Sequence, residues 1–297
     1  MNKLYITIAG KSNVGKSSFI NHLCNNYVTP ESSKLQTTRI NTYHSFIKKN
    51  SEIIFIDTPG ISVVKKDLMS DFMKKSYIKS LDIADAVLII FDISKKGTKN
   101  ESSIIKICEE NNIPVFISVN KIDLYKDDSI LFEKIEELSN LYNKKIYPLS
   151  IHNNIGIDLL VNDICKIKSS TKKNISFQYN DNDKKKLIIQ ELIRGIINNI
   201  MYGEVPYESA VVVDVLENKE KLIRIKSTII VNNTNQKKIL IGTSGQNIKK
   251  IGIESRLLIE KIYSKDVYID LIVKVNENWK NDIQILKKIG FASCKIP

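Results

Sequence analysis

The first 167 residues alternate short apolar runs with longer amphipathic stretches. Four runs are rich in branched residues, as strands buried on both faces are: "KLYITIA" (3–9), "EIIFID" (52–57), "AVLIIFD" (86–92) and "VFISVN" (115–120). Helix-like stretches lie around residues 16–26, 68–82, 100–111, 129–142 and 156–167. This order predicts an α/β fold with a mostly parallel sheet flanked by helices, whose ligands bind beyond the carboxyl ends of the strands.

The pattern changes in the last part of the chain. A polar stretch, "KIKSSTKKNISFQYNDND", has no sustained period and is typical of a linker. The segments expected after it are a helix over 183–202, strands over 209–217 and 221–232, a glycine loop leading into a helix that ends near 262, a strand over 266–275 and a helix near 280–289. We therefore predict an N-terminal domain over 1–168, a linker over 169–182 and a small α+β domain over 183–297.

Composition narrows the class of protein. Hydrophobic residues make up 42% and charged residues 26%, which excludes disordered and fibrous chains. No apolar run approaches the roughly 20 residues of a membrane-spanning helix, and the opening "MNKLYITIAG" lacks the pattern of a signal peptide. The four cysteines have no paired spacing, which favours a reduced, cytoplasmic compartment over a zinc or disulfide framework.

The net charge of +12 is ambiguous. Such an excess favours an anionic partner, either nucleic acid or a membrane surface. The chain is also crowded with Lys, Asn and Ile, as an A+T-rich genome would encode, so solvated surface lysines explain the charge equally well. Charge alone therefore leaves both interpretations open.

The stretch "GKSNVGKS" (10–17) matches the phosphate-binding pattern G-x-x-x-x-G-K-[ST]. It follows a predicted strand and precedes a predicted helix, which is the context that the motif requires. Gly10 and Gly15 allow a turn whose backbone N–H groups converge on a phosphate, helped by the positive end of the helix. We expect Lys16 to reach the β- and γ-phosphates and Ser17 to bind Mg²⁺.

Two further stretches supply groups for the γ-phosphate. "FIDTPG" ends a buried strand in Asp57, placed to hold Mg²⁺ through water, and leaves the Gly60 N–H to meet a γ-phosphate. "SKLQTTRIN" lies between this motif and the phosphate loop, where a γ-phosphate-sensing switch segment belongs. We predict Thr38 as the second Mg²⁺ ligand, with Thr37 as the alternative.

Base recognition is predicted at the ends of two later strands. In "VNKID", Asp123 can accept two hydrogen bonds from the guanine edge, whereas adenine offers a different pattern; Asn120 and Lys121 brace the same loop. In "PLSIHN", Ser150 falls beside the base. The four motifs, in this order and at strand ends, predict a guanine-specific GTPase.

Hydrolysis is predicted to be slow without a partner. The residue after "DTPG" is Ile61, where Ras-like enzymes place a glutamine that orients the attacking water. Isoleucine cannot orient water, so we expect backbone groups and a partner to do so. Asn13, inside the phosphate loop, is a candidate ligand for a monovalent cation such as K⁺, which would supply the positive charge of an arginine finger.

A second glycine loop lies in "KKILIGTSGQNIKKIG". A G-x-x-G turn between a short apolar segment and a helix is the arrangement of a KH domain, whose loop clamps about four nucleotides of a single strand. A side chain at Gly242 or Gly245 would hold the sugar–phosphate backbone away, and Lys249 and Lys250 add positive charge on the next turn. We call residues 242–245 the KH loop; a plain helix-entry turn is the alternative interpretation.

Together these motifs resemble the bacterial Era family, small GTPases with a C-terminal type II KH domain. The resemblance covers nearly the whole chain and rests on "GKSNVGKSS", "SKLQTTR", "DTPG", "NKID", "QELIRG", "GEVPYES", "IGTSGQNIKKIG" and "WKND", in that order. It implies a GTP-hydrolysing switch that binds the 3′ end of small-subunit rRNA and assists maturation of the small ribosomal subunit. It also implies a cytoplasmic protein with peripheral contact at the inner membrane face, and we expect a monomer.

Motifs and resemblance together define the expected site residues. For GTP or GDP they are Gly10, Asn13, Gly15, Lys16, Ser17, Ser18, Asp57, Asn120, Lys121, Asp123, Ser150 and Ile151. For Mg²⁺ they are Ser17, Thr38 and Asp57; for catalysis, Lys16, Thr38 and Gly60; and for RNA, Gly242, Thr243, Ser244, Gly245, Lys249, Lys250 and Arg256.

The chain departs from the family pattern at two places. Ile151 stands where the family usually has alanine, which weakens the expected contact with the base. Thr243 and Ser244 stand where the family usually has a lysine between the KH-loop glycines, so RNA affinity is expected to depend more on the lysines and the arginine of the next helix.

Two other functions are compatible with parts of the sequence. One is a constitutive RNA-binding protein whose nucleotide domain only adds stability; intact Lys16, Ser17 and Asp123 argue against it. The other is a tRNA-modifying GTPase, suggested by Cys294 near the C-terminus, and the lack of an additional large domain argues against it.

Overall fold

A computed structural model describes residues 2–24, 39–59, 67–94, 99–125, 127–169 and 181–291. Contacts between these residues form two compact units. The first unit holds the described residues of 2–24, 41–59 and 76–169, and the second holds 39–40, 67–75 and 181–291. The expected domain boundaries at 168 and 183 stay predictions, because most of the expected linker lies outside the described residues.

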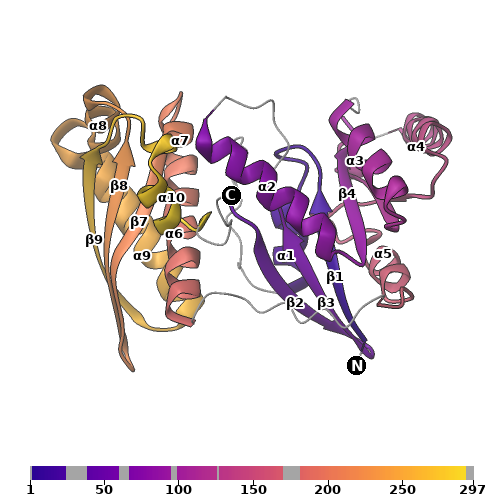
Figure 1. Cartoon of the computed structure of the whole chain (residues 1–297), viewed down its shortest axis with the longest axis horizontal. Coiled ribbons are helices and arrows are strands. Elements are labelled where there is room, and N and C mark those ends of the chain that lie inside the picture. The colour runs from indigo at the N-terminus through magenta and orange to yellow at the C-terminus, as the bar shows by residue number, and fades with distance from the viewer. Residues whose placement is uncertain are drawn as a thin grey trace. The chain divides into compact units, whose positions relative to one another are not determined.

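The first unit is built on a six-stranded sheet with the order β2-β3-β1-β4-β5-β6. Figure 1 labels four of its strands, β1 to β4. Its strands are β1 (Asn2–Ala9), β2 (Thr42–Lys48), β3 (Ser51–Asp57), β4 (Ala86–Asp92), β5 (Val115–Asn120) and β6 (Ile146–Pro148). All neighbours run parallel except β2 and β3, which are antiparallel. Every residue of β4 is buried, as its unbroken apolar run predicts for a central strand.

Helices of the first unit cover this sheet. They are α1 (Lys16–Cys24), α3 (Lys99–Glu110), α4 (Asp128–Tyr142), α5 (Ile157–Ile164) and the second half of α2 (Leu68–Ile83). Leu81 of α2 and Ile105 of α3 share one buried cluster with Val87 and Ile117 of the central strands. On α1, Phe19 packs edge-to-face against Phe55 of β3, with 5.7 Å between ring centroids.

The second unit contains a three-stranded sheet with the order β7-β8-β9. Its elements are α6 (Asp181–Ile200), α7 (Val205–Glu208), β7 (Ser209–Asn218), β8 (Leu222–Val231), α8 (Thr234–Ile241), α9 (Gln246–Tyr263), β9 (Asp266–Val275) and α10 (Ile283–Lys288). Strands β7 and β8 are antiparallel, and β8 and β9 are parallel. Helices α6 and α9 pack on the sheet and share its buried core with Ile225 and Ile229 of β8 (Figure 1). The predicted fold class, an α/β unit followed by a small α+β unit, is confirmed.

A second buried cluster in this unit forms around Trp279, which is fully buried. Alternate residues of β7, Ala210 and Val212, belong to this cluster, whereas Val211 and Val213 belong to the cluster under α6 and α9. Ile40 and two residues from the start of α2, Met69 and Phe72, complete the cluster around Trp279. The second unit is therefore assembled from three separate stretches of the chain.

Arg39 lies beside Trp279 and is only 2% exposed. Its guanidinium donates hydrogen bonds to the backbone oxygens of Ser209 (2.6 Å), Tyr207 (3.0 Å) and Pro206 (3.2 Å), and it lies 5.7 Å from the centre of the Trp279 ring. Burial, with a smaller effect of nearby cationic charge, lowers the pKa of Arg39 to about 9. Three carbonyl acceptors offset much of the cost of burying this charge.

Candidate functional site

The phosphate loop joins β1 to α1, which begins at Lys16. Gly15 has φ +106°, and a Cβ there would lie 2.3 Å from the Asn120 side-chain nitrogen, so no other residue fits. The Lys16 ammonium donates to the backbone oxygens of Gly10 (3.1 Å) and Lys11 (2.8 Å). The loop therefore holds its own lysine at the N-terminus of α1, where a phosphate binds favourably.

Two of the predicted Mg²⁺ ligands lie in contact. The Ser17 hydroxyl donates a 3.0 Å hydrogen bond to Oδ2 of Asp57, which is fully buried at the end of β3. Hydroxyl and carboxylate oxygens are the ligands that Mg²⁺ prefers, so this donor set fits that ion. Thr38 and Gly60, the predicted partners for Mg²⁺ and the γ-phosphate, lie outside the described residues.

The guanine-binding loop is braced by hydrogen bonds to the loops beside it. The Asn120 side chain donates to the backbone oxygen of Val14 (2.9 Å) and accepts from the backbone N–H of Ile151 (3.2 Å). The buried Ser150 hydroxyl donates to Oδ1 of Asp123 at 2.5 Å. The carboxylate predicted to read guanine is thus oriented by the hydroxyl predicted to lie beside the base.

Lys121 connects the guanine-binding loop to the phosphate loop. Its ammonium donates to the backbone oxygen of Asn13 (3.0 Å) and forms an ion pair with Oδ2 of Asp92 (2.7 Å). Burial alone would raise the pKa of the Asp92 carboxyl, but hydrogen bonds from Lys121 and Ser94 outweigh it and hold this pKa below its ordinary value. Sequence analysis did not single out Asp92.

The structure therefore brings the predicted nucleotide residues to one edge of the sheet in the first unit, beyond the carboxyl ends of β1, β3 and β5. Ser18 follows Ser17 in the first turn of α1. Ile151 is 9% exposed, and its side chain would lie 3.1 Å from a Cβ on Gly15, so it packs against the phosphate loop. We call this cluster, from the phosphate loop to Ile151, the nucleotide site.

The KH loop lies between α8 and α9 in the second unit. Gly242 and Gly245 have φ of +76° and +77°, and Ser244 between them has φ +51°. Gly245, the N-cap of α9, has no side chain to cap the first turn, which leaves backbone N–H groups of an 18-residue helix directed at the loop. This is the geometry in which a helix N-terminus receives a phosphate.

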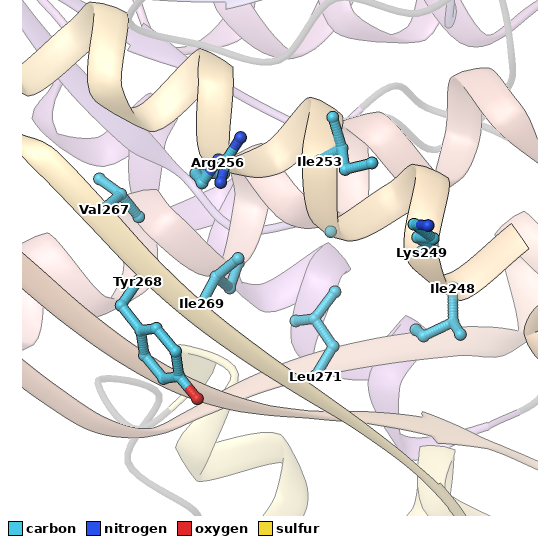
Figure 2. A pocket seen from close by; sticks show the side chains of 9 residues that line it. Ile248, Lys249, Ile253, Arg256, Val267, Tyr268, Ile269 and Leu271 are labelled. Atoms are coloured by element: carbon cyan, nitrogen blue, oxygen red, sulfur yellow. The ribbon is translucent and has the colours of Figure 1, made fainter. Parts of the chain in front are cut away.

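A groove of about 390 Å³ begins next to the KH loop. Helix α9 forms one wall and strand β9 the other (Figure 2). Its lining residues are Ile248, Lys249, Gly252, Ile253, Arg256, Val267, Tyr268, Ile269 and Leu271. An apolar floor between Lys249 and Arg256 suits flat bases, with the cations available to the phosphates that join them.

The predicted RNA residues divide between this groove and the surface. Lys249 and Arg256 line the groove, whereas Lys250 does not and pairs loosely with Glu254 (3.9 Å) on the exposed side of α9. Sequence analysis did not identify Ile253 or Leu271, because half-exposed apolar residues on an amphipathic helix and strand resemble core positions. One feature of the sequence could have indicated the groove: Ile253 follows Lys249 by four residues, so the two side chains lie on the same face of the helix.

Two family models match the chain. One, described as a 50S ribosome-binding GTPase, matches residues 5–121, and the other, described as a KH domain, matches residues 204–280. The fold, the nucleotide site and the KH loop thus define a GTPase joined to a KH domain.

Comparison with individual proteins narrows this class. The chain is 30% identical over 285 residues to the GTPase Era of Borrelia duttonii (strain Ly). The alignment covers 96% of this chain and 98% of that protein. Crystal structures of a variant of Aquifex aeolicus Era bound to GDP·AlF4⁻, and of Era in complex with MgGDPNP and nucleotides 1506–1542 of 16S ribosomal RNA, each superpose with a TM-score of 0.89 at 29% identity over 98% of the chain. The chain belongs to the Era family of GTPases.

No helix of the described segments combines the length and the apolar character needed to cross a bilayer.

Proposed function

We propose that this protein is a GTP-hydrolysing switch that binds the 3′ region of small-subunit rRNA and assists maturation of the small ribosomal subunit. The observation that carries the proposal is the match, over both units, to Era bound to MgGDPNP and 16S rRNA nucleotides 1506–1542. The groove beside the KH loop and the nucleotide site supply the matching chemistry within this chain.

In the proposed mechanism, the phosphate loop binds the β-phosphate through backbone N–H groups, and Lys16 leaves its carbonyl partners to reach the β- and γ-phosphates. Ser17 and Asp57 are the residues that would hold Mg²⁺ directly and through water, with Thr38 joining when GTP is bound. The bound ion would offset negative charge on the phosphates. Asp123 accepts both guanine N–H groups and makes the site specific for that base.

Among the described residues of the nucleotide site, none has a side chain assigned to orient the attacking water. Ile61, next to Gly60, has no polar atom beyond its backbone. We therefore propose slow intrinsic hydrolysis that a ribosomal partner accelerates, with the Gly60 N–H contributing to γ-phosphate binding.

The second unit binds RNA in this proposal. The KH loop holds the sugar–phosphate backbone, the groove receives bases on Ile253 and Leu271, and Lys249 and Arg256 contact phosphates at its edge. Because Thr243 and Ser244 replace a lysine inside the loop, the affinity depends on the two groove cations.

One experiment tests whether GTP hydrolysis and RNA binding are coupled in this protein. GTP turnover by the full-length protein is measured with and without an oligonucleotide that copies the 3′ end of small-subunit rRNA, beside a Lys16→Ala variant. We expect measurable turnover that the oligonucleotide increases, and turnover at the limit of detection in Lys16→Ala. If the protein binds the oligonucleotide but its turnover does not exceed that of Lys16→Ala, it is a constitutive RNA-binding protein instead.

We also propose that Asn13 helps to bind K⁺ in the GTP-bound state. Its backbone has φ +67° and its carbonyl already accepts from Lys121, so the residue is fixed beside the phosphates. A bound K⁺ would place positive charge near the phosphates, where an arginine finger acts in other GTPases. We expect turnover to be about 10-fold faster in 100 mM KCl than in 100 mM NaCl, on the scale of one electrostatic contact. Equal rates in the two salts would contradict the proposal.

For the whole chain we propose a monomer that acts in the cytoplasm, with peripheral contact at the inner face of the membrane. The net charge of +12 supports attraction to both rRNA and anionic lipid. Cell fractionation at low and high salt tests the membrane contact, since an electrostatic attachment is released by salt.

A further inference from the structure

Asp92 is a buried carboxylate at the end of β4, beside the nucleotide site, to which no role has yet been assigned. Its side chain is 2% exposed. Oδ2 pairs with the Lys121 ammonium at 2.7 Å, and Oδ1 accepts from the backbone N–H (3.0 Å) and the hydroxyl (2.6 Å) of Ser94. The hydrogen bonds therefore fix the orientation of both carboxylate oxygens, which is uncommon in an exposed ion pair at the protein surface.

The position of Asp92 is also fixed by the sheet. It pairs with Asn120 in the parallel ladder between β4 and β5, and the next residue, Ile93, donates its N–H to the Asn120 carbonyl at 3.1 Å. The carboxylate thus stands directly beside the residue that precedes Lys121. Its distance to the Lys121 ammonium is set by two hydrogen-bonded strands.

The hydrogen bond from Lys121 to the Asn13 carbonyl joins two residues whose backbone conformation is strained. Lys121 has φ +68° and Asn13 has φ +67°, a left-handed conformation that is unfavourable for a residue other than glycine. Such conformations persist only where surrounding contacts hold them. The Lys121 ammonium supplies that contact, since it is bonded to the Asn13 carbonyl on one side and to Asp92 on the other.

We propose that Asp92 is a positioning residue for nucleotide binding, which holds Lys121 against Asn13 and so fixes the guanine-binding loop to the phosphate loop. This inference rests on the proposed nucleotide site and adds to it a residue that touches neither base nor phosphate. A preset spacing between the two loops lowers the cost of binding a ligand that spans both of them.

The test is an Asp92→Asn variant of the full-length protein, which keeps the shape of the side chain and removes its charge. We expect a roughly 10-fold rise in Kd for GDP and for GTP alike, carried by faster dissociation, because both nucleotides span the two loops. At saturating GTP in a buffer without K⁺, kcat should stay within about twofold of the wild-type value, since the γ-phosphate contacts are unchanged. The preference for GDP over XDP should also persist, because Asp123 still reads the base.

A double-mutant cycle separates positioning from a merely structural role. If Asp92 acts through Lys121, Asp92→Asn combined with Lys121→Met should bind GDP no more weakly than Lys121→Met alone. Additive losses would overturn the proposal, as would wild-type affinity in Asp92→Asn. Asp158→Asn is the matched control, since it removes a carboxylate that pairs with Lys48 at 2.5 Å but is 87% exposed, and its affinity should be unchanged.

The result also distinguishes this inference from the proposed function. If Asp123→Asn changes base preference while Asp92→Asn binds normally, only the role of Asp92 is wrong. If neither substitution affects guanine binding, the nucleotide site itself is misassigned.

Discussion

An Asp123→Asn variant is expected to lose at least about 100-fold in GTP affinity and to gain affinity for XTP. The carboxylate is predicted to accept two N–H groups of guanine, and an amide presents a donor where one of these bonds requires an acceptor. Two hydrogen bonds to a charged group contribute roughly 3–6 kcal/mol, which corresponds to a factor of about 100 or more. Xanthine has a carbonyl in place of the guanine amino group, so the amide donor of asparagine matches it. Titration with fluorescent GDP, GTP and XTP measures both changes.

The control for this variant is the same substitution four residues later. Asp127 is the N-cap of α4 and accepts from the Ser129 N–H at 2.9 Å. Asparagine caps helices about as well as aspartate, so Asp127→Asn should leave both nucleotide affinity and stability unchanged. Unaltered GTP affinity in Asp123→Asn would remove the assignment of this residue to base recognition.

Replacing both KH-loop glycines by aspartate is expected to reduce RNA affinity by about 100-fold and to leave GTP affinity unchanged. Side chains at Gly242 and Gly245 would separate the RNA backbone from the loop, and their carboxylates would repel its phosphates. The loss of two charge-assisted hydrogen bonds accounts for roughly 3 kcal/mol, which is about 100-fold. Filter binding with the 3′-end oligonucleotide at several salt concentrations measures the affinity and the number of phosphate contacts.

A Gly203→Asp variant is the matched control for the KH loop. Gly203 also has a positive φ, +67°, and nothing within 4 Å of the position of an added Cβ, so the substitution brings the same kind of backbone strain and charge outside the loop, at one position instead of two. RNA affinity should be retained in this control. Parallel loss of RNA and GTP binding in the double variant would indicate misfolding of the chain rather than a role in RNA binding.

The motifs could be located from sequence because their chemistry tolerates few residue types. A lysine and a serine after a glycine turn, and an aspartate at a strand end, are restrictive enough to place Lys16, Ser17 and Asp57 near one another, and the structure brings the last two to 3.0 Å. The roles of these residues stay predictions. Thr38 and Gly60 fall outside the described residues, so their places are untested.

Strand β2 was not predicted because neither of its sides is consistently apolar. Its less exposed side carries Thr42, His44, Phe46 and Lys48, none of them buried, whereas the exposed side carries Ser45 together with Tyr43 and Ile47, which are 37% and 65% exposed. The strand forms because its backbone pairs with β3 along its whole length, not because it buries an apolar face. Single-sequence periodicity cannot detect a strand of that kind.

Asp92 and the groove were missed for a related reason. Nothing local connects Asp92 to Lys121, which lies 29 positions later; only the ladder between β4 and β5 brings them together. The groove likewise depends on how α9 lies along β9, which fixes the facing of Ile253 and Leu271. Local sequence patterns do not predict contacts that depend on the register between elements far apart in the chain.

The mixed origin of the second unit has a practical consequence for anyone who dissects this protein. A fragment expressed from residue 181 onward would lack Arg39, Ile40, Met69 and Phe72. It would expose the apolar surface around Trp279 and leave the backbone carbonyls of Pro206, Tyr207 and Ser209 without their guanidinium donor. Such a fragment, although it contains every residue predicted to bind RNA, would be prone to aggregate, and weak binding by it would reflect a damaged scaffold instead of the affinity of the intact protein.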